Sequence, residues 1–124
     1  MRKYDYTELR AWQRAVDLAV AVYEVSRSMP AEERYGLTAQ MRRAVVSISA
    51  NIAEGQCRRT SGEFLNSLSV AYGSIGELET DVILAGRLHL LNDGSVKGIL
   101  EQCAEVGRLV NGLASSVRRS VAAG

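Results

Sequence analysis

The stretch TSGEFLNSLSVAYGSIGELETDVILAG, residues 60–86, decides the fold. Its apolar side chains recur at alternating steps of four and three residues, the heptad spacing of helices that pack at shallow crossing angles. These positions are Phe64, Leu68, Ala71, Ile75, Leu78, Val82 and Ala85. Thr60 and Glu63 precede them with the spacing of a capping box, in which each side chain can satisfy a free backbone N–H of the first turn. The stretch therefore predicts a helix over about 61–90.

Three further segments, at about 7–28, 37–58 and 95–120, show the apolar spacing of amphipathic helices. Their expected core positions are Leu9, Trp12, Val16, Ala19 and Tyr23 in the first, Leu37, Met41, Val45, Ile48 and Ile52 in the second, and Ile99, Cys103, Val106, Val110, Leu113 and Val117 in the last. PAEERYG at 30–36 and Asn92-Asp93-Gly94 separate the segments, and we expect Ser95 to cap the last one. Residues 1–124 thus predict a single all-α domain, an antiparallel up-down-up-down four-helix bundle.

Composition limits the classes to which the protein can belong. The net charge of +1 does not by itself indicate a nucleic acid or an acidic membrane as partner. The N-terminal residues lack the apolar region of a signal peptide, and no stretch approaches the roughly 18 apolar residues of a membrane helix. Cys57 and Cys103 lack a paired spacing, so we expect two packed thiols in a reducing compartment. We expect a cytoplasmic protein without a membrane partner.

The sequence offers no catalytic or metal-binding motif. His89 is the only histidine, and Gly86 stands where the Glu-x-x-His pair of a di-iron bundle needs its acid. Neither cysteine has the local signature of a nucleophile, and Glu77 and Glu79 point to different faces of a helix. GSIGELET follows a helical pattern rather than a strand, so it is not a phosphate loop. We expect no enzyme, cofactor or metal.

A polar stripe lies beside the core of the second predicted helix. Ser47, Asn51 and Glu54 fall on one line of its helical wheel, and Arg43 falls opposite Glu77 if the second and third helices form a hairpin near Thr60. Residues 34–59 carry a net charge of +4 and residues 60–86 carry −4, so the two segments are electrostatic complements. We interpret the stripe as structural pairing between helices, and a ligand-binding role is the alternative.

Arginines near the helix ends are the candidates for nucleic-acid contacts. Phosphate contacts need clusters of exposed cations and little else. The first candidates are Arg42, Arg43, Arg58 and Arg59, followed by Arg10 and Arg14. Aromatic residues do not interleave with them as a base-stacking platform requires. The alternative is an ordinary solvated or salt-bridged surface.

Three stretches resemble the four-helix-bundle family first known from intervening sequences of bacterial 23S ribosomal RNA genes. They are LRAWQRAVDLAVAVYE at 9–24, YGLTAQMRRAVVSISANIAEG at 35–55 and EFLNSLSVAYGSIGELETDVILAGRLHLL at 63–91. The resemblance implies a ring of copies, a homopentamer, and kinship with the accessory protein of diversity-generating retroelements, a basic partner of a reverse transcriptase. Relatives often carry proline where this chain has Ser49, so we expect a less kinked second helix.

These observations favour a non-catalytic, homo-oligomeric bundle that acts as a nucleic-acid-associated accessory or adaptor. The nucleic acid could be RNA or DNA, and the protein partner implied by the resemblance is a reverse transcriptase. The alternative is a structural or protein-interaction module that binds no nucleic acid.

Overall fold

The computed structural model describes residues 5–123, which form four α-helices and two short 3-10 turns. The helices are α1 (Arg10–Ser26), α2 (Leu37–Cys57), α3 (Ser61–Arg87) and α4 (Asp93–Ala123), and the turns are η1 (Tyr6–Glu8) and η2 (Ala31–Glu33). No strand occurs within these residues, and the predicted all-α class is confirmed. The chain near residue 7 forms η1 rather than the first turn of α1, because Leu9 has an extended backbone. Residues 1–4 and 124 of the predicted domain lie outside the described range.

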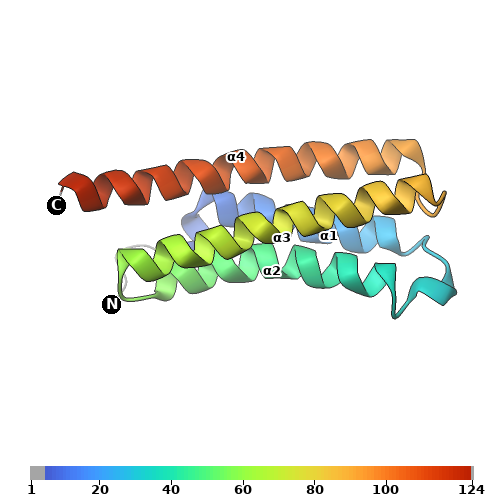
Figure 1. Ribbon diagram of the computed structural model, residues 1–124, viewed down its shortest axis with the longest axis horizontal. Coiled ribbons are helices and arrows are strands. Elements are labelled where there is room, and N and C mark those ends of the chain that lie inside the picture. Colours follow the sequence, from blue (N-terminus) through green and yellow to red (C-terminus); the bar gives the residue numbers. More distant parts are fainter. Residues whose placement is uncertain (1–4, 124) are drawn as a thin grey trace.

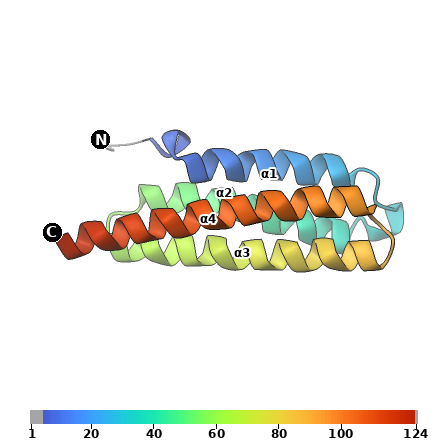
Figure 2. The same ribbon diagram turned by 90° about the horizontal axis from the view of Figure 1, so that it is seen from above.

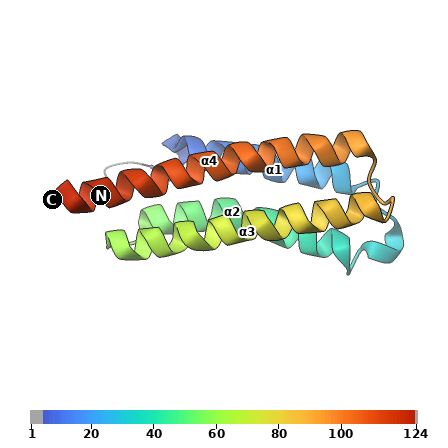
Figure 3. The ribbon, with the colours of Figure 1, turned by 45° about the horizontal axis from the view of Figure 1, so that its top comes forward.

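The helices form an antiparallel bundle in which each packs against its neighbours in sequence, and α1 closes the square against α4 (Figure 1). Seen from above, α4 lies between α1 and α3 (Figure 2). Figure 3 shows the pair α1 and α4 above the pair α2 and α3. We call the end with the turn at 58–60 the hairpin end and the end with residues 27–36 and 88–92 the connection end. The up-down-up-down topology follows from the short links.

The core consists of one buried stripe from each helix. Every apolar position expected in α2 is buried, and six of the seven positions of the α3 seam are buried. Phe64 is half-buried against the core, as are Leu113 and Val117 at the end of the α4 seam. The prediction is confirmed for α2 and α3, and for α4 from Ile99 to Val110.

The core positions predicted for α1 are wrong, because a different line of residues on this helix faces the core. Its buried line is Ala11, Ala15, Leu18 and Val22. Trp12 is half-buried and packs edge-on against Tyr6, with ring centroids 5.5 Å apart, and Tyr23 is 40% exposed. Alanines therefore take the buried positions at the start of α1, and the larger Trp12 and Tyr23 lie on its flanks.

The ends of the helices are capped by side chains and by one left-handed residue. Thr60 Oγ1 accepts a hydrogen bond from the Glu63 amide, as predicted, but the Glu63 carboxylate binds the Thr60 hydroxyl rather than a backbone N–H. Asn92, not Ser95, caps α4, because its Oδ1 accepts from the Ser95 amide. His89 has a φ of 60°, which lets the Leu90 amide bond the Ala85 carbonyl in a Schellman motif.

Gly55 lies where α2 and α3 approach each other closely. A Cβ atom there would lie 2.8 Å from Phe64 Cδ1 and 2.9 Å from Ser67 Cβ, well inside ordinary van der Waals contact. Gly55, the last residue of the stretch quoted at 35–55, is thus required by packing.

The two cysteines differ in environment. Cys57 is exposed, so the prediction of a packed thiol there is wrong, whereas Cys103 is buried. Burial, followed by the charge of Glu79, raises the pKa of Cys103 to about 12. Cys103 is therefore an unreactive core residue.

Candidate nucleic-acid interface

The polar stripe lies along the contact between α2 and α3. Ser47 Oγ and Ser74 Oγ lie 2.9 Å apart across the two helices. The Asn51 amide donates to the Ser47 carbonyl at 2.9 Å and to Ser47 Oγ at 3.1 Å. This chain of hydrogen bonds links the stripe of α2 to the backbone and to α3, and Ser74 is buried.

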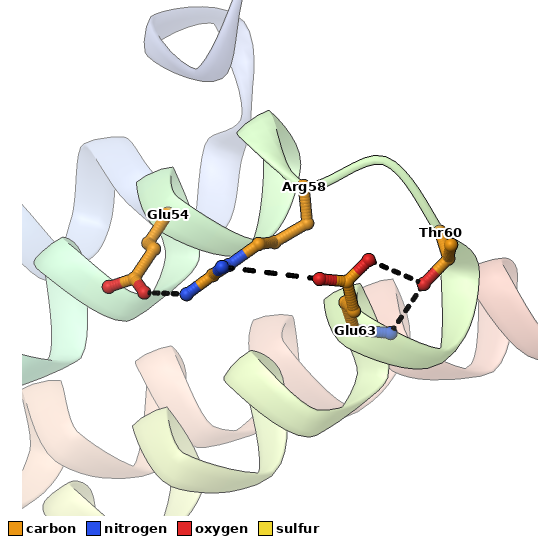
Figure 4. A network of polar contacts seen from close by, with 4 residues as sticks. All are labelled: Glu54, Arg58, Thr60 and Glu63. Carbon is orange, nitrogen blue, oxygen red and sulfur yellow. Dashed lines mark hydrogen bonds and ion pairs between the residues drawn. The ribbon is translucent and has the colours of Figure 1, made fainter.

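Arg58 is held in a network of carboxylates at the hairpin end (Figure 4). Its guanidinium pairs with Glu54 one turn earlier on α2, and Nη1 lies 4.0 Å from Glu63 Oε2 on α3. Thr60 Oγ1 donates to Glu63 Oε1 at 2.9 Å, so one network spans the end of α2 and the start of α3. The charge of Arg58 is therefore offset within the chain.

Arg42 lies on the side of α2 that faces α1. Its Nε donates to Ser26 Oγ at 2.9 Å, and its guanidinium carbon lies 4.7 Å from the centre of the Tyr23 ring. Together a hydrogen bond and a cation–π contact fix the orientation of the guanidinium. The side chain is half-buried and has no carboxylate partner among the described residues.

Arg43, next in sequence, faces α3 instead. It lines a depression of 630 Å³ between α2 and α3 that also holds Glu77 and Asp81. Burial raises the pKa of Asp81, the charge of Glu77 raises it further, and Arg43 lowers it. Arg43 and Glu77 share this depression as the hairpin register predicts, but no ion pair joins Arg43 to a described carboxylate.

The remaining candidates lie toward the hairpin end. Arg14 pairs with Asp17 at 2.9 Å and approaches Glu105 of α4 at 3.7 Å. Arg10 and Arg59 are exposed, and within residues 5–123 they have no ion pair. Of the six arginines, Arg10, Arg43 and Arg59 are therefore exposed and without an ion pair to a described carboxylate, although Arg43 shares its depression with Glu77 and Asp81.

Two basic residues missed by the sequence reasoning lie at the connection end. Arg27 and Arg34 line one depression together with Arg42, although the first two lie in the connection after α1 and the third lies in α2. Sequence clustering could not find them, because only the turn of the chain after α1 brings them together.

Exposed apolar side chains occur on the α1–α2 side of the bundle and on both flanks of α3. On the α1–α2 side, Val20 is 54% exposed and Val46 is 46% exposed, beside a depression of 340 Å³ that Tyr23 lines. On α3 the exposed apolar residues are Val70, Tyr72, Ile83 and Leu84.

The family model of the 23S rRNA-intervening sequence proteins matches residues 7–112. The chain belongs to this family. The resemblance seen in the sequence motifs is thereby confirmed, whereas kinship with the retroelement accessory protein stays a prediction.

A solved structure shares the fold of this family member. It is a protein of unknown function from the S23 ribosomal protein family of Bacteroides thetaiotaomicron VPI-5482. The two align with a TM-score of 0.78 and 20% sequence identity, over 84% of this chain and 97% of the other. Among curated proteins, none matches the sequence.

The described part of the chain holds neither a metal-binding cluster nor a membrane-spanning helix. Within residues 5–123 no group of three or more His, Cys, Asp or Glu side chains is placed to hold a metal ion. None of the helices in the same range is long and apolar enough to cross a membrane.

Proposed function

We propose that the protein is a non-catalytic, cytoplasmic homo-oligomer that binds nucleic acid as an accessory or adaptor. The observation that carries this proposal is the exposure of Arg10, Arg43 and Arg59, none of which has an ion pair with a described carboxylate. Nucleic-acid affinity comes largely from such cations, because each phosphate that they neutralise releases a condensed counterion. Arg14 and Arg58 contribute less, because their charges are already paired.

Self-association is part of this proposal, because it would gather the cations of several chains. A chain with a net charge of +1 binds a polyanion weakly, but a ring of copies gathers several sets of the same arginines on one assembly. The exposed apolar side chains Val20, Tyr23 and Val46 offer a surface that association would bury. The assembly that we propose is a pentamer, as the family resemblance implies.

The test is a fluorescence-anisotropy titration of labelled duplex RNA and single-stranded DNA at several salt concentrations. We expect binding that weakens steeply with salt. In the triple variant Arg10→Gln, Arg43→Gln and Arg59→Gln, the slope of log K against log salt for duplex RNA should become shallower by about 0.9 for each phosphate that the protein no longer neutralises. The control, Arg87→Gln, Arg118→Gln and Arg119→Gln, removes the same number of charges from other exposed sites.

Light scattering of each variant gives the oligomeric state, and a pentamer has five times the 13.5 kDa mass of one chain. Equal loss of affinity in the two triple variants would show that only net charge matters and would reject these three positions. An intact oligomer that binds neither nucleic acid would favour the second candidate, a protein-interaction module. That candidate is supported by Val70, Tyr72, Ile83 and Leu84, which are exposed along α3.

A further inference from the structure

We propose that the depression at the connection end binds a phosphomonoester group, the dianionic phosphate at the end of a nucleic-acid strand or on a small molecule. Its volume is 330 Å³, and Arg27, Arg34 and Arg42 line it together with the side chains of Ser26 and Thr38. This site is separate from Arg10, Arg43 and Arg59, so it does not depend on the function proposed above.

The charge of the depression is unbalanced. No aspartate or glutamate is among its lining residues, and none of its three arginines has an ion pair with a described carboxylate. The nearby Glu33 carboxylate is engaged elsewhere, because its Oε1 accepts a hydrogen bond from the Leu37 amide at 3.1 Å. Three guanidiniums around one depression repel each other, and a bound anion removes that repulsion.

Arg42 is oriented for such an anion before it arrives. Its Nε donates a hydrogen bond to Ser26 Oγ, and its guanidinium lies over the Tyr23 ring. The two terminal nitrogens of Arg42 have no hydrogen bond to a described residue. A half-buried guanidinium whose two terminal nitrogens are unpaired suits a phosphate, because a phosphate can accept two parallel hydrogen bonds from one arginine. Less conformational freedom is then lost on binding.

Thr38 provides the second, independent indication of a ligand. It is 7% exposed and lines the depression, and its Oγ1 is buried without a hydrogen-bond partner among the described residues. Buried hydroxyls are normally satisfied. Thr38 also lies in the first turn of α2, where the helix dipole favours an anion.

A phosphomonoester matches this charge better than a phosphodiester of the nucleic-acid backbone does. Its second pKa is about 6, so at neutral pH it carries nearly two negative charges, whereas the diester carries one. The depression has a volume of 330 Å³, roughly ten times the ~30 Å³ that one water occupies in the liquid. It therefore has room for more than a phosphate group. Part of the esterified group can therefore enter with the phosphate.

The first experiment is equilibrium dialysis of radiolabelled inorganic phosphate against the full chain at pH 7.5, with ionic strength fixed by sodium chloride. We expect saturable binding with a dissociation constant on the order of 1 mM or lower, equivalent to about 4 kcal/mol. Arg27→Gln and Arg34→Gln should each weaken it about tenfold, because each removes a charge-assisted hydrogen bond. Both side chains are exposed, so neither variant threatens folding.

Two matched variants separate binding from structure. Arg87→Gln removes one charge at the same end of the bundle outside the depression and should leave the affinity unchanged. Thr38→Val should weaken phosphate binding several-fold while the melting temperature of the free protein stays the same or rises. Binding should also weaken at pH 5, where the phosphate loses one charge. The proposal is overturned if phosphate does not bind saturably, or if Arg27→Gln and Arg34→Gln bind it as tightly as the parent.

A second experiment distinguishes the two sources of the phosphate. Anisotropy is measured for two short labelled oligonucleotides that differ only in a 5′-phosphate or a 5′-hydroxyl. Tighter binding of the phosphorylated strand that Arg34→Gln abolishes assigns the site to a strand end. Equal binding of the two strands, with inorganic phosphate still bound, assigns it to a small phosphorylated molecule. Failure of the Arg10, Arg43 and Arg59 variants to alter nucleic-acid binding leaves this test unaffected.

Discussion

Replacement of Gly55 by alanine tests how closely α2 and α3 pack. The added Cβ would lie 2.8 Å from Phe64 Cδ1 and 2.9 Å from Ser67 Cβ, against about 3.5–4.0 Å for an ordinary carbon contact. Phe64 can rotate in part, but Ser67 Cβ is attached to the backbone of α3. The helices must therefore separate by several tenths of an ångström, and overpacking of this kind costs about 1–3 kcal/mol.

The same substitution also brings a gain, since alanine in a helix interior is favoured over glycine by about 0.5–1 kcal/mol. We therefore expect Gly55→Ala to lower the free energy of unfolding by about 1 kcal/mol. Gly73 and Gly112 are the matched controls, because both are helical and a Cβ at either would meet no atom within 4 Å. Gly73→Ala and Gly112→Ala should raise the free energy of unfolding by about 0.5–1 kcal/mol.

Urea denaturation followed by circular dichroism measures the three variants at one fixed protein concentration, because association contributes to apparent stability. The predicted difference between Gly55→Ala and either control is about 2 kcal/mol, with opposite signs relative to the parent. If Gly55→Ala were stabilised as much as Gly112→Ala, with an unchanged oligomeric mass, the close approach of α2 and α3 at this residue would be refuted.

Three further outcomes follow from single residues. His89→Gly should raise the free energy of unfolding by about 1 kcal/mol in thermal or chemical melts, because glycine adopts the left-handed conformation at the end of α3 without strain; a loss of stability would contradict this. Cys57 should react readily with a thiol reagent and Cys103 only after unfolding, since Cys103 is buried with a pKa of about 12; mass spectrometry of labelled peptides identifies each. Asp81→Asn should stabilise the protein at pH 7 but not at pH 3. Because burial and Glu77 raise the folded pKa of Asp81, the folded state holds its proton more tightly than the unfolded state. Stability is therefore lost as pH rises from the ordinary value of 3.8 through the folded pKa, and equal effects at the two pH values would reject this account.

The apolar spacing was sufficient to predict the buried stripes of α2, α3 and most of α4, because in these helices the regularly spaced apolar residues are the ones that the bundle buries. In α1 it was not sufficient. Alanine and valine occur on several faces of α1, so more than one apolar line is available to face the core. The bundle buries Ala11 and Ala15, while Trp12 and Tyr23 lie beside the core. Periodicity alone does not tell which of two neighbouring apolar lines on a helix faces the core.

The arginine candidates show a second limit of sequence reasoning. Arg42 and Arg43 are adjacent in sequence, yet one faces α1 and the other faces α3, since successive residues on a helix differ by about 100°. The partner of Arg58 could be foreseen, because Glu54 precedes it by one turn. The group formed by Arg27, Arg34 and Arg42 could not, because it depends on the path of the connection between α1 and α2.

The turn between α2 and α3 has a consequence for the order in which the chain folds. Only residues 58–60 separate these two helices, whereas α1 and α4 meet across the whole of α2 and α3. Loop-closure entropy grows with the length of chain enclosed, so the α2–α3 hairpin is the least costly nucleus and the α1–α4 contact forms late. Substitutions between α2 and α3 should therefore slow folding, whereas those between α1 and α4 should mainly accelerate unfolding.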